Sequence, residues 1–369
     1  LRSVELDDLL GREPVDLDWD AMSQMVRGRR VLITGGAGSI GSELCRQVAR
    51  LDPNAVVLVE QNEFSLYSLS LELEERFPQI TFHRLLGDVC DRQSMRFIFN
   101  EYRPEIVFHA AAYKHVPMLQ DQVRETIRNN TFGTIAVAEA AIDFGVEKMV
   151  LISTDKAVNP SSMMGVSKRL AEIVGQLSND RSTTRFITVR FGNVLGSAGS
   201  VVPLFEHQIK NGGPVTVTDP QMTRYFMTIS EACQLILQAC AMGHGGEIFV
   251  LNMGEPVKID YLARQMIRLA GKIPDDDIEI RYTGLRPGEK LSEELFHPDE
   301  NLTATSYEKI LLAQGRSADK DRFWSAVGAM SEAIDACDHA EVRKLAVALV
   351  PEYVGDQVLG SRLSPDAAA

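Results

Sequence analysis

The sequence predicts an α/β fold, in which a doubly wound parallel sheet carries helices on both faces and a smaller mixed α/β lobe is attached to it. Short apolar runs rich in β-branched residues alternate with amphipathic segments through the first half of the chain, as in successive strand–helix units. A glycine-rich turn directly follows the first of these runs. Beyond residue 192, glycine and proline become frequent and helical patterns become less regular, which indicates the smaller lobe.

The expected strands are near-continuous apolar runs, which are typical of strands buried on both faces of a parallel sheet. They lie at 30–34, 55–60, 80–86, 106–110, 149–153 and 186–191, and a run at 248–252 is expected to return to the same sheet. Amphipathic segments at 65–77 and 93–102 are expected to be helices between these strands. The stretch 319–349 also has a helical pattern, and Pro351 is expected to end it.

The chain is expected to divide into an N-terminal arm or linker at 1–30, a sheet domain at 31–195, a smaller substrate lobe at 196–315, and a C-terminal helical segment with a tail at 316–369. The arm shows no strong period and holds an acidic stretch at 16–20.

Composition narrows the class of protein. The net charge of −13 and the pI of about 5.1 argue against a nucleic-acid binder. The five cysteines are scattered without CxxC spacing, so neither a zinc site nor a disulfide framework is expected. No apolar run approaches the roughly 18 residues that span a bilayer. The chain begins with Leu1, and we expect a cytoplasmic protein, or the cytoplasmic part of an inner-membrane protein whose N-terminal anchor is missing here.

Three glycines form the first motif. Gly35, Gly38 and Gly41 give GxxGxxG between the first strand and the following helix, a variant of the Rossmann dinucleotide fingerprint. This spacing allows a tight turn, a close approach of the backbone to a pyrophosphate, and close packing of helix on strand. The pyrophosphate is expected at the helix N-terminus, beside Ser39 and Ile40.

The end of the second strand indicates which dinucleotide binds. Glu60 lies 19 positions beyond Gly41, where a carboxylate accepts hydrogen bonds from ribose hydroxyls and repels a 2′-phosphate. The loop that follows, at 61–63, has no Arg or Lys. Tightly bound NAD is therefore expected, and NADP is disfavoured.

The ends of the third and fourth strands complete the expected cofactor site. Asp88 and Val89 are placed to read the adenine edge, although Asp88 or Asp91 could instead cap a helix. Ala110 and Ala111 are small enough for the backbone to lie close to the cofactor.

The fifth strand carries the expected catalytic group. Thr154, Asp155 and Lys156 close this strand, and Lys168 follows four residues after Met164. The segment resembles extended short-chain dehydrogenases, in which a Tyr-x-x-x-Lys motif stands here. Lys168 fits that motif, whereas Met164 replaces the tyrosine. Taken alone, this replacement favours an inactive, NAD-sensing protein.

Longer stretches favour an enzyme. Residues 109–117 (HAAAYKHVP), 153–168, 190–205 and 286–290 (RPGEK) resemble the UDP-N-acetylglucosamine 4,6-dehydratases of bacterial polysaccharide biosynthesis, which include enzymes of O-antigen synthesis. In the large, membrane-anchored branch of that family, Met commonly replaces the tyrosine. The resemblance covers about residues 1–315 and includes the arm at 8–15.

This resemblance implies a mechanism. NAD takes hydride from C4 of the sugar, the resulting ketone acidifies the C5 hydrogen, water leaves from C5 and C6, and hydride returns to C6. Lys156 is expected to be the neutral base at C5 and Asp155 the protonated acid at the leaving hydroxyl. Thr154 is expected to bind the 4-hydroxyl, and Lys168 the nicotinamide ribose. Asp155, Thr154 through a water, and Lys156 remain alternatives for removing the proton of the 4-hydroxyl. A solvated loop with a capping Asp is the structural alternative.

The resemblance also implies substrate contacts. Arg286 is expected to bind the diphosphate and Glu289 the uridine ribose, while Asn193 and the loop with Ser200 and Val201 are expected at the diphosphate and base. Further expected contacts are Arg224 at the diphosphate, and Lys114 and His115 at the sugar. Asn193 could instead cap a turn, and Arg224 could form a surface ion pair.

The sequence therefore predicts a lyase that converts UDP-N-acetylglucosamine to its 4-keto-6-deoxy derivative, with retention at C5 implied by the Met-containing branch. The alternatives are a UDP-N-acetylhexosamine 4-epimerase, which normally needs the tyrosine, and a non-catalytic NAD-sensing protein.

A homo-oligomer is expected to form through helices at about 115–143 and 161–178, because related dehydrogenases pair as four-helix bundles.

Overall fold

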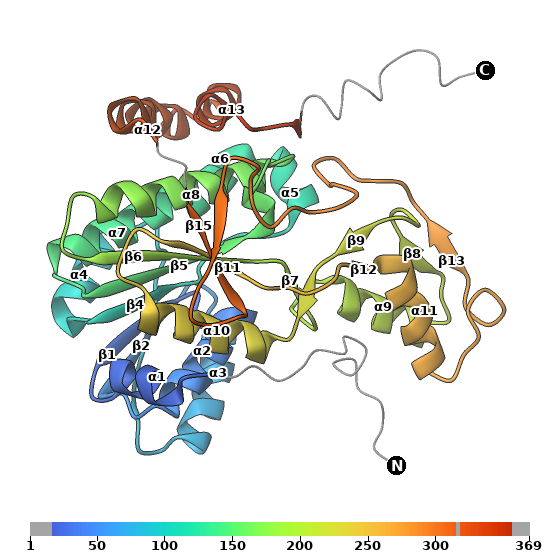
Figure 1. Cartoon of the computed structure of the whole chain (residues 1–369), viewed down its shortest axis with the longest axis horizontal. Helices are drawn as coiled ribbons and strands as arrows, with labels where there is room; N and C mark the ends of the chain where they lie inside the picture. The colour runs from blue at the N-terminus through green and yellow to red at the C-terminus, as the bar shows by residue number, and fades with distance from the viewer. Residues whose placement is uncertain (1–16, 315–317, 356–369) are drawn as a thin grey trace.

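The computed structural model describes residues 17–314 and 318–355. Within them, nine strands form one sheet in the order β14-β15-β11-β6-β5-β4-β1-β2-β3 (Figure 1). The strands are β1 (Arg30–Thr34), β2 (Ala55–Glu60), β3 (Thr81–Leu86), β4 (Ile106–His109), β5 (Lys148–Thr154), β6 (Arg185–Phe191), β11 (Ile248–Leu251), β14 (Asn301–Ala304) and β15 (Ile310–Gln314). All pairs from β3 to β11 are parallel, which confirms the expected α/β fold.

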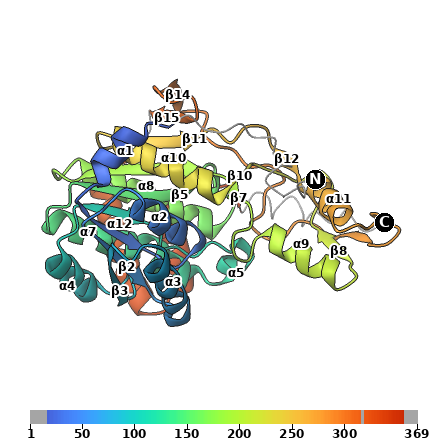
Figure 2. The ribbon, with the colours of Figure 1, turned by 90° about the horizontal axis from the view of Figure 1, so that it is seen from below.

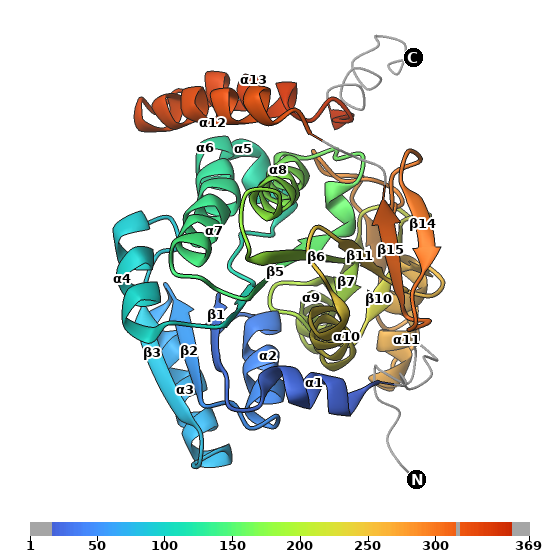
Figure 3. The ribbon, with the colours of Figure 1, turned by 60° about the vertical axis from the view of Figure 1, so that its left-hand side comes forward.

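Helices cover both faces of this sheet, as Figure 3 shows. One face carries α1 (Trp19–Val26), α2 (Ser39–Ala49), α3 (Glu63–Arg76) and α10 (Ile229–Met242). The other carries α4 (Arg92–Tyr102), α5 (Val116–Asp121), α6 (Val123–Ile127), α7 (Gly133–Asp143) and α8 (Met163–Asn179), with a π-helix at Arg128–Phe132. Strand β1 contributes side chains to the apolar cores on both faces of the sheet. Val31 and Ile33 pack on the first face and Leu32 on the second, because side chains alternate along a strand.

A second lobe lies beside the carboxyl ends of the strands (Figure 2). It contains α9 (Val201–Lys210), α11 (Ile259–Leu269) and the strand pairs β8–β13 and β9–β12, and β7–β10 lies between it and the sheet. The short strands are β7 (Asn193–Val194), β8 (Val215–Val217), β9 (Thr223–Arg224), β10 (Phe226–Met227), β12 (Val257–Lys258) and β13 (Ile280–Tyr282). The lobe has an apolar core of its own, with Phe205 at its centre.

The chain returns to the large sheet more often than the sequence indicates. Besides β11, the hairpin β14–β15 extends the sheet through antiparallel pairing of β15 with β11, although we expected all residues up to 315 in the smaller lobe. Helix α10 also packs on the sheet domain, against α2. Short edge strands have few apolar residues, so their pattern does not reveal which sheet they join.

Residues 19–26, which we expected in an arm, form helix α1. Asp18 caps it by accepting a hydrogen bond of 2.9 Å from the backbone N–H of Ala21, and Met22 and Val26 are buried on the sheet domain. Two turns of helix are too short to give a clear period. The arm at 8–15 and the tail at 361–369 lie outside the described residues.

The expected C-terminal helix is a pair, α12 (Lys320–Asp335) and α13 (His339–Ala348), separated by a turn with Cys337 at φ 56°. This pair packs on α6 and α8 (Figures 1 and 3). A buried ion pair of 3.1 Å between Arg169 of α8 and Glu352 fixes the chain that follows. The outer face of α8, through which we expected subunits to pair, is therefore covered by the chain's own helices. Among the described helices, none has both the length and the apolar character for crossing a bilayer.

Candidate active site

The turn between β1 and α2 leaves no room for side chains. A Cβ on Gly41 would lie 2.0 Å from the carbonyl oxygen of Gly35, and a Cβ on Gly35 would lie 2.7 Å from Cα of Ala111. Gly35 also has φ +62°, and Gly38 caps the N-terminus of α2. The three glycines therefore bring a helix N-terminus and bare backbone together, which fits the pyrophosphate of a dinucleotide.

A pocket of about 180 Å³ lies along this turn. It brings together most of the expected cofactor residues with several others: Gly35, Gly38, Val59, Glu60, Gln61, Gly87, Val89, Ala110, Ala111, Ala112, Tyr113 and Asn129. Ser39 lies at its rim, where its hydroxyl accepts a hydrogen bond of 3.2 Å from the N–H of Ala198 in the loop before α9. Ile40 follows in the first turn of α2.

Glu60 ends β2 beside the glycine turn. One carboxylate oxygen accepts hydrogen bonds from the N–H groups of Gln61 and Asn62, at 2.9 and 3.0 Å, and the other accepts one of 3.2 Å from Ala37. These bonds hold the carboxylate at the pocket, and a carboxylate has lone pairs left to accept further hydrogen bonds.

Asp88 forms an ion pair that the sequence did not indicate. Its Oδ2 lies 3.0 Å from Arg128 Nη2, and its Oδ1 accepts a hydrogen bond from the N–H of Cys90. Burial raises the pKa of Asp88, but these two partners outweigh it and the pKa is lowered on balance. Asp91, not Asp88, caps α4.

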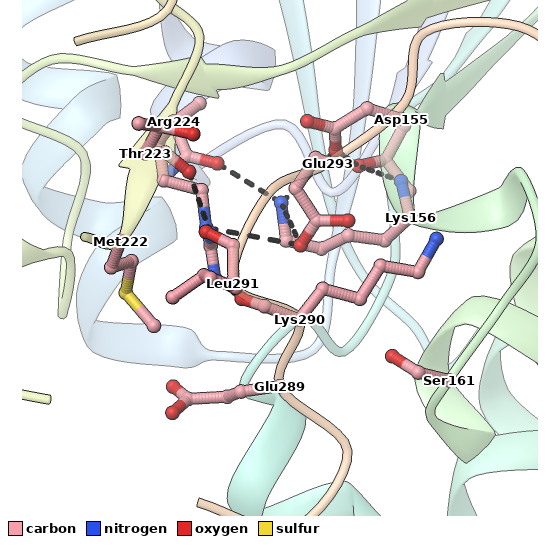
Figure 4. Close-up of polar contacts among 12 residues, drawn as sticks. Asp155, Lys156, Ser161, Met222, Thr223, Arg224, Glu289, Lys290, Leu291 and Glu293 are labelled. Atoms are coloured by element: carbon pink, nitrogen blue, oxygen red, sulfur yellow. Dashed lines mark hydrogen bonds and ion pairs between the residues drawn. The ribbon is translucent and has the colours of Figure 1, made fainter. Parts of the chain in front are cut away.

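Thr154, Asp155 and Lys156 lie together where β5 ends and a short 3₁₀ turn (Asp155–Ala157) begins. Figure 4 shows Asp155 and Lys156 side by side. The hydroxyl of Thr154 donates a hydrogen bond of 2.8 Å to Oδ1 of Asp155. The Nζ of Lys156 donates to the same oxygen at 3.0 Å. Asp155 is fully buried, and its Oδ2 has no hydrogen-bond partner. A hydroxyl, a carboxyl and an amine thus form a connected group at the carboxyl edge of the sheet.

Lys168 lies on α8 behind this group. Its Nζ donates a hydrogen bond of 2.6 Å to the carbonyl of Ile152 on β5. Burial lowers the pKa of Lys168 to about 8, although Glu172 favours the charged form. Met164 precedes Lys168 by one helical turn and is buried, so α8 presents a thioether where the expected motif has a phenol.

A buried charge network supports the end of β5. Glu172 of α8 accepts hydrogen bonds of 2.7 Å from Ser153 and from both Nε and Nη2 of Arg190. Glu300 completes the pairing of Arg190 from the other side. Burial raises the pKa of Glu172, but Arg190 and Arg169 overcome this and lower it to about 2. Sequence reasoning missed this network because its members are far apart in the chain.

Arg224, which we expected to bind the diphosphate, is hydrogen-bonded to protein backbone in the structure. Its guanidinium donates hydrogen bonds to the backbone carbonyls of Thr223, Lys290 and Leu291, at 2.6 to 3.2 Å. Arg224 therefore holds the loop that follows the RPGEK motif, and most of its donors are used within the protein.

Glu293, at the end of that loop, also escaped sequence reasoning. Its Oε1 lies 3.8 Å from Nζ of Lys156 and 3.8 Å from Nε of Arg224, and Figure 4 shows it between them. The side chain is 4% exposed. Its place directly after RPGEK was the one available signal.

The remaining expected substrate residues form the outer part of the site. Arg286 and Glu289 pair with each other at 2.6 Å, with Arg286 largely exposed. Asn193 accepts a hydrogen bond of 3.0 Å from Lys156.

Lys114 is exposed, and the ring of His115 packs against Gly199. Ser200 caps α9, which begins at Val201, and its hydroxyl is buried without a partner. Among the described residues, no group of three or more His, Cys, Asp or Glu is arranged to hold a metal.

Comparison with known proteins gives a consistent result. A family model described as polysaccharide biosynthesis protein matches residues 31–315. The capsular polysaccharide biosynthesis protein CapD of Staphylococcus aureus is 53% identical over 84% of this chain and 52% of its own length. The probable polysaccharide biosynthesis protein EpsC of Bacillus subtilis is 47% identical over 93% of this chain and 57% of its own. The chain thus spans about half the length of these two relatives.

Relatives with a named reaction are more distant. The UDP-N-acetylglucosamine 4,6-dehydratase (inverting) of Campylobacter jejuni is 31% identical over 77% of this chain and 82% of its own length. A UDP-glucose 4-epimerase of Rickettsia bellii is 36% identical over 74% and 79%. Among solved structures, Pen from Bacillus thuringiensis is similar with a TM-score of 0.73 and 34% identity, over 78% of this chain and 88% of that one.

Proposed function

The chain belongs to the family of polysaccharide biosynthesis proteins, and within it we propose that this protein is a 4,6-dehydratase of UDP-N-acetylglucosamine. The observation that carries the proposal is the connected group of Thr154, Asp155 and Lys156 at the carboxyl end of β5. Elimination of water next to a ketone needs one base and one acid, and this group offers both beside the dinucleotide turn.

NAD is the proposed cofactor. When bound, it takes up a hydride from the sugar and later returns it, so the reaction is redox-neutral. The glycine turn would hold its pyrophosphate and Glu60 its adenosine ribose, because a carboxylate there repels the extra phosphate of NADP. Lys168 would bind the ribose next to the nicotinamide, in place of its present bond to the carbonyl of Ile152.

The contacts favour one route for the proton of the 4-hydroxyl. Oxidation at C4 releases this proton, and the hydroxyl of Thr154 can relay it to Asp155 over the existing 2.8 Å hydrogen bond. Asp155 then holds the proton that the departing 6-hydroxyl needs. Lys156 removes the hydrogen at C5 and, after its amine has exchanged with solvent, returns a proton to C5 once water has left. This route needs no tyrosine, which accounts for Met164.

The UDP part would lie against the outer residues. Arg286 has a guanidinium exposed enough to reach a diphosphate, and its partner Glu289 is placed to accept hydroxyl groups of the uridine ribose. Asn193 would contact the sugar, a position that its hydrogen bond from Lys156 supports. Lys114 and His115 would contact the sugar from the end of β4.

A 4-epimerase is the second candidate, supported by the similarity to UDP-glucose 4-epimerases. Such an enzyme oxidises and reduces the same carbon, so it needs neither an acid for a leaving hydroxyl nor a base at C5. Asp155 could then still take the proton of the 4-hydroxyl, but the amine of Lys156 would have no task. A non-catalytic NAD-sensing protein has even less use for them.

Proton NMR in heavy water tests the proposal. The purified protein is incubated with UDP-N-acetylglucosamine, first without added cofactor and then with NAD. A new C6 methyl signal together with deuterium at C5 is the expected result. A spectrum of UDP-N-acetylgalactosamine would mean an epimerase, and an unchanged substrate under both conditions would leave the sensing protein.

A further inference from the structure

Two carboxylate oxygens at the site are buried without a partner: Oδ2 of Asp155 and Oε2 of Glu293. An unpartnered buried carboxylate oxygen is costly and uncommon, and at a functional site it marks a place where a proton or a ligand arrives. The proposed function gives Asp155 such a task. It gives none to Glu293.

The position of Glu293 is built by the surrounding chain. Arg224 holds Lys290 and Leu291, which lie three and two positions before Glu293, through their backbone carbonyls. Lys290 in turn donates a hydrogen bond of 3.1 Å to the carbonyl of Val158, and Ser161 donates one of 2.8 Å to the carbonyl of Gly288. The loop is thus tied to the segment directly after Lys156, which fixes the carboxyl of Glu293 beside the amine.

The charges around Lys156 raise a difficulty for its proposed role. Its Nζ has Asp155 at 3.0 Å and Glu293 at 3.8 Å, and Arg224 is the other cation that faces Glu293. A lysine amine in water is an ammonium group at neutral pH. An ammonium group cannot remove a hydrogen from carbon. Lys156 must therefore pass its own proton to another group before it acts.

Resting on the proposed dehydratase function, we propose that Glu293 is this group: it takes the ammonium proton of Lys156 and so converts the lysine to a base. Asp155 cannot serve, since it already receives the proton of the 4-hydroxyl. The distance of 3.8 Å shortens to a hydrogen bond when the flexible lysine side chain moves by about 1 Å. Glu293 acts on the substrate only through Lys156 and is in this sense a positioning residue.

The proton count balances. Asp155 gains the proton of O4 and gives it to O6, whose bond to carbon breaks as water leaves. Lys156 gives one proton to Glu293, takes the C5 proton, gives one proton back to C5 after its amine has exchanged with solvent, and recovers its own from Glu293. The hydride that leaves C4 returns to C6. At the end of the cycle, Asp155, Lys156 and Glu293 are all in their starting states.

The variant E293Q tests the proposal, because an amide of the same size cannot take the proton. Its neighbour Glu294 supplies the matched control E294Q, since that carboxylate is half exposed and lies outside the site. For each protein, kcat is measured against pH, the absorbance of the reduced cofactor reports oxidation at C4, and deuterium at C5 reports loss of the C5 hydrogen.

We expect E293Q to lose about 10²-fold or more in kcat at neutral pH. Oxidation at C4 should persist while exchange at C5 is lost, and kcat should recover as pH rises, because hydroxide then removes the lysine proton. E293D should restore part of the activity, and E294Q should match the wild type. A pH profile of E293Q parallel to that of the wild type, or equal loss of oxidation and exchange, overturns the proposal.

The outcomes separate this inference from the proposed function. If the wild-type protein makes no 6-deoxy product, the dehydratase assignment fails and the role of Glu293 falls with it. If the wild type is active and E293Q behaves as E294Q does, the inference alone fails. If E293Q does not fold, the dependence of kcat on pH is compared between E293D and the wild type instead. The kcat of E293D, which has the shorter carboxylate, must still recover at high pH if the inference holds.

Discussion

Oδ1 of Asp155 lies 3.0 Å from Nζ of Lys156, so the proposed acid and the proposed base share one hydrogen bond. The same oxygen accepts the hydroxyl of Thr154 at 2.8 Å. This arrangement places a hydroxyl, a carboxyl and an amine on adjacent residues, at the end of one strand. A turn of this kind is able to replace the proton-transfer role of a tyrosine, because its hydroxyl connects directly to a carboxyl.

Replacement of Lys156 by alanine should abolish dehydration and leave the cofactor bound. The variant lacks the amine that removes the C5 hydrogen, and such groups contribute about 10²- to 10⁴-fold. Formation of the C6 methyl group is measured by NMR, and bound cofactor by absorbance after denaturation. The exposed Lys344→Ala on α13 is the control. Undiminished turnover of K156A would remove Lys156 as the base.

Replacement of Gly41 by alanine should weaken dinucleotide binding by at least about tenfold, which corresponds to about 1.4 kcal/mol. The new Cβ would lie 2.0 Å from the carbonyl oxygen of Gly35, so the turn must open and lose its fit to the pyrophosphate. Isothermal titration with NAD measures the affinity. Unchanged affinity in G41A would show that the cofactor does not use this turn.

Gly328→Ala is the matched glycine control and should stabilise the fold. Gly328 is exposed in the middle of α12, and a Cβ there meets no atom within 4 Å. Alanine in a helix interior is favoured over glycine by about 0.5–1 kcal/mol. Urea denaturation should show a higher midpoint with unchanged NAD affinity. A lower midpoint would mean that this helix does not tolerate the methyl group.

The sequence predicts the sheet domain well because its signals are local. An apolar run, a glycine turn and a helix follow one another directly at 30–49, and parallel strands bring their carboxyl ends to one edge. The residues after β1, β2, β4 and β5 must therefore meet there. This geometric rule explains why residues from the ends of β1, β2 and β4 line one pocket, and why the group at 154–156 stands at the same edge of the sheet.

Contacts between distant segments could not be predicted in the same way. Arg190 and Glu300 are separated by 110 residues, and no pattern in either segment indicates their ion pair. Arg224 was expected at a phosphate because an arginine motif does not reveal that carbonyl groups will surround it. Glu293 was missed because a carboxylate after a motif gains its meaning only when the loop folds back on Lys156.

Replacement of Arg286 by alanine should raise KM for the UDP-sugar about 10- to 100-fold and change kcat little. Hydrogen bonds to charged groups contribute about 1.5–3 kcal/mol, and this guanidinium is proposed to bind the diphosphate away from the reacting carbons. Steady-state kinetics separates the two constants. Arg281→Ala, on an exposed residue of β13 paired with Glu279, is the control. A fall in kcat at constant KM would place Arg286 at the chemistry instead.

Replacement of Glu172 by glutamine should change how stability depends on pH. Arg190 and Arg169 outweigh the burial of Glu172 and lower its pKa from 4.5 to about 2. Because the folded-state pKa is the lower one, the unfolded chain binds the proton first as pH falls. The stabilisation is therefore complete above pH 4.5 and is lost between pH 4.5 and 2. It is on the order of 3 kcal/mol.

Urea denaturation of both proteins from pH 7 to pH 3 measures this dependence. E172Q should be less stable at pH 7, because Arg190 loses a buried partner, and its stability should fall less steeply below pH 4.5. Glu75→Gln, an exposed carboxylate on α3, should reproduce the wild-type curve. Equal slopes for E172Q and the wild type would mean that Glu172 has no lowered pKa in the folded protein. The ion pair between Arg190 and Glu300 would then have to stabilise the end of β5 without a charged Glu172.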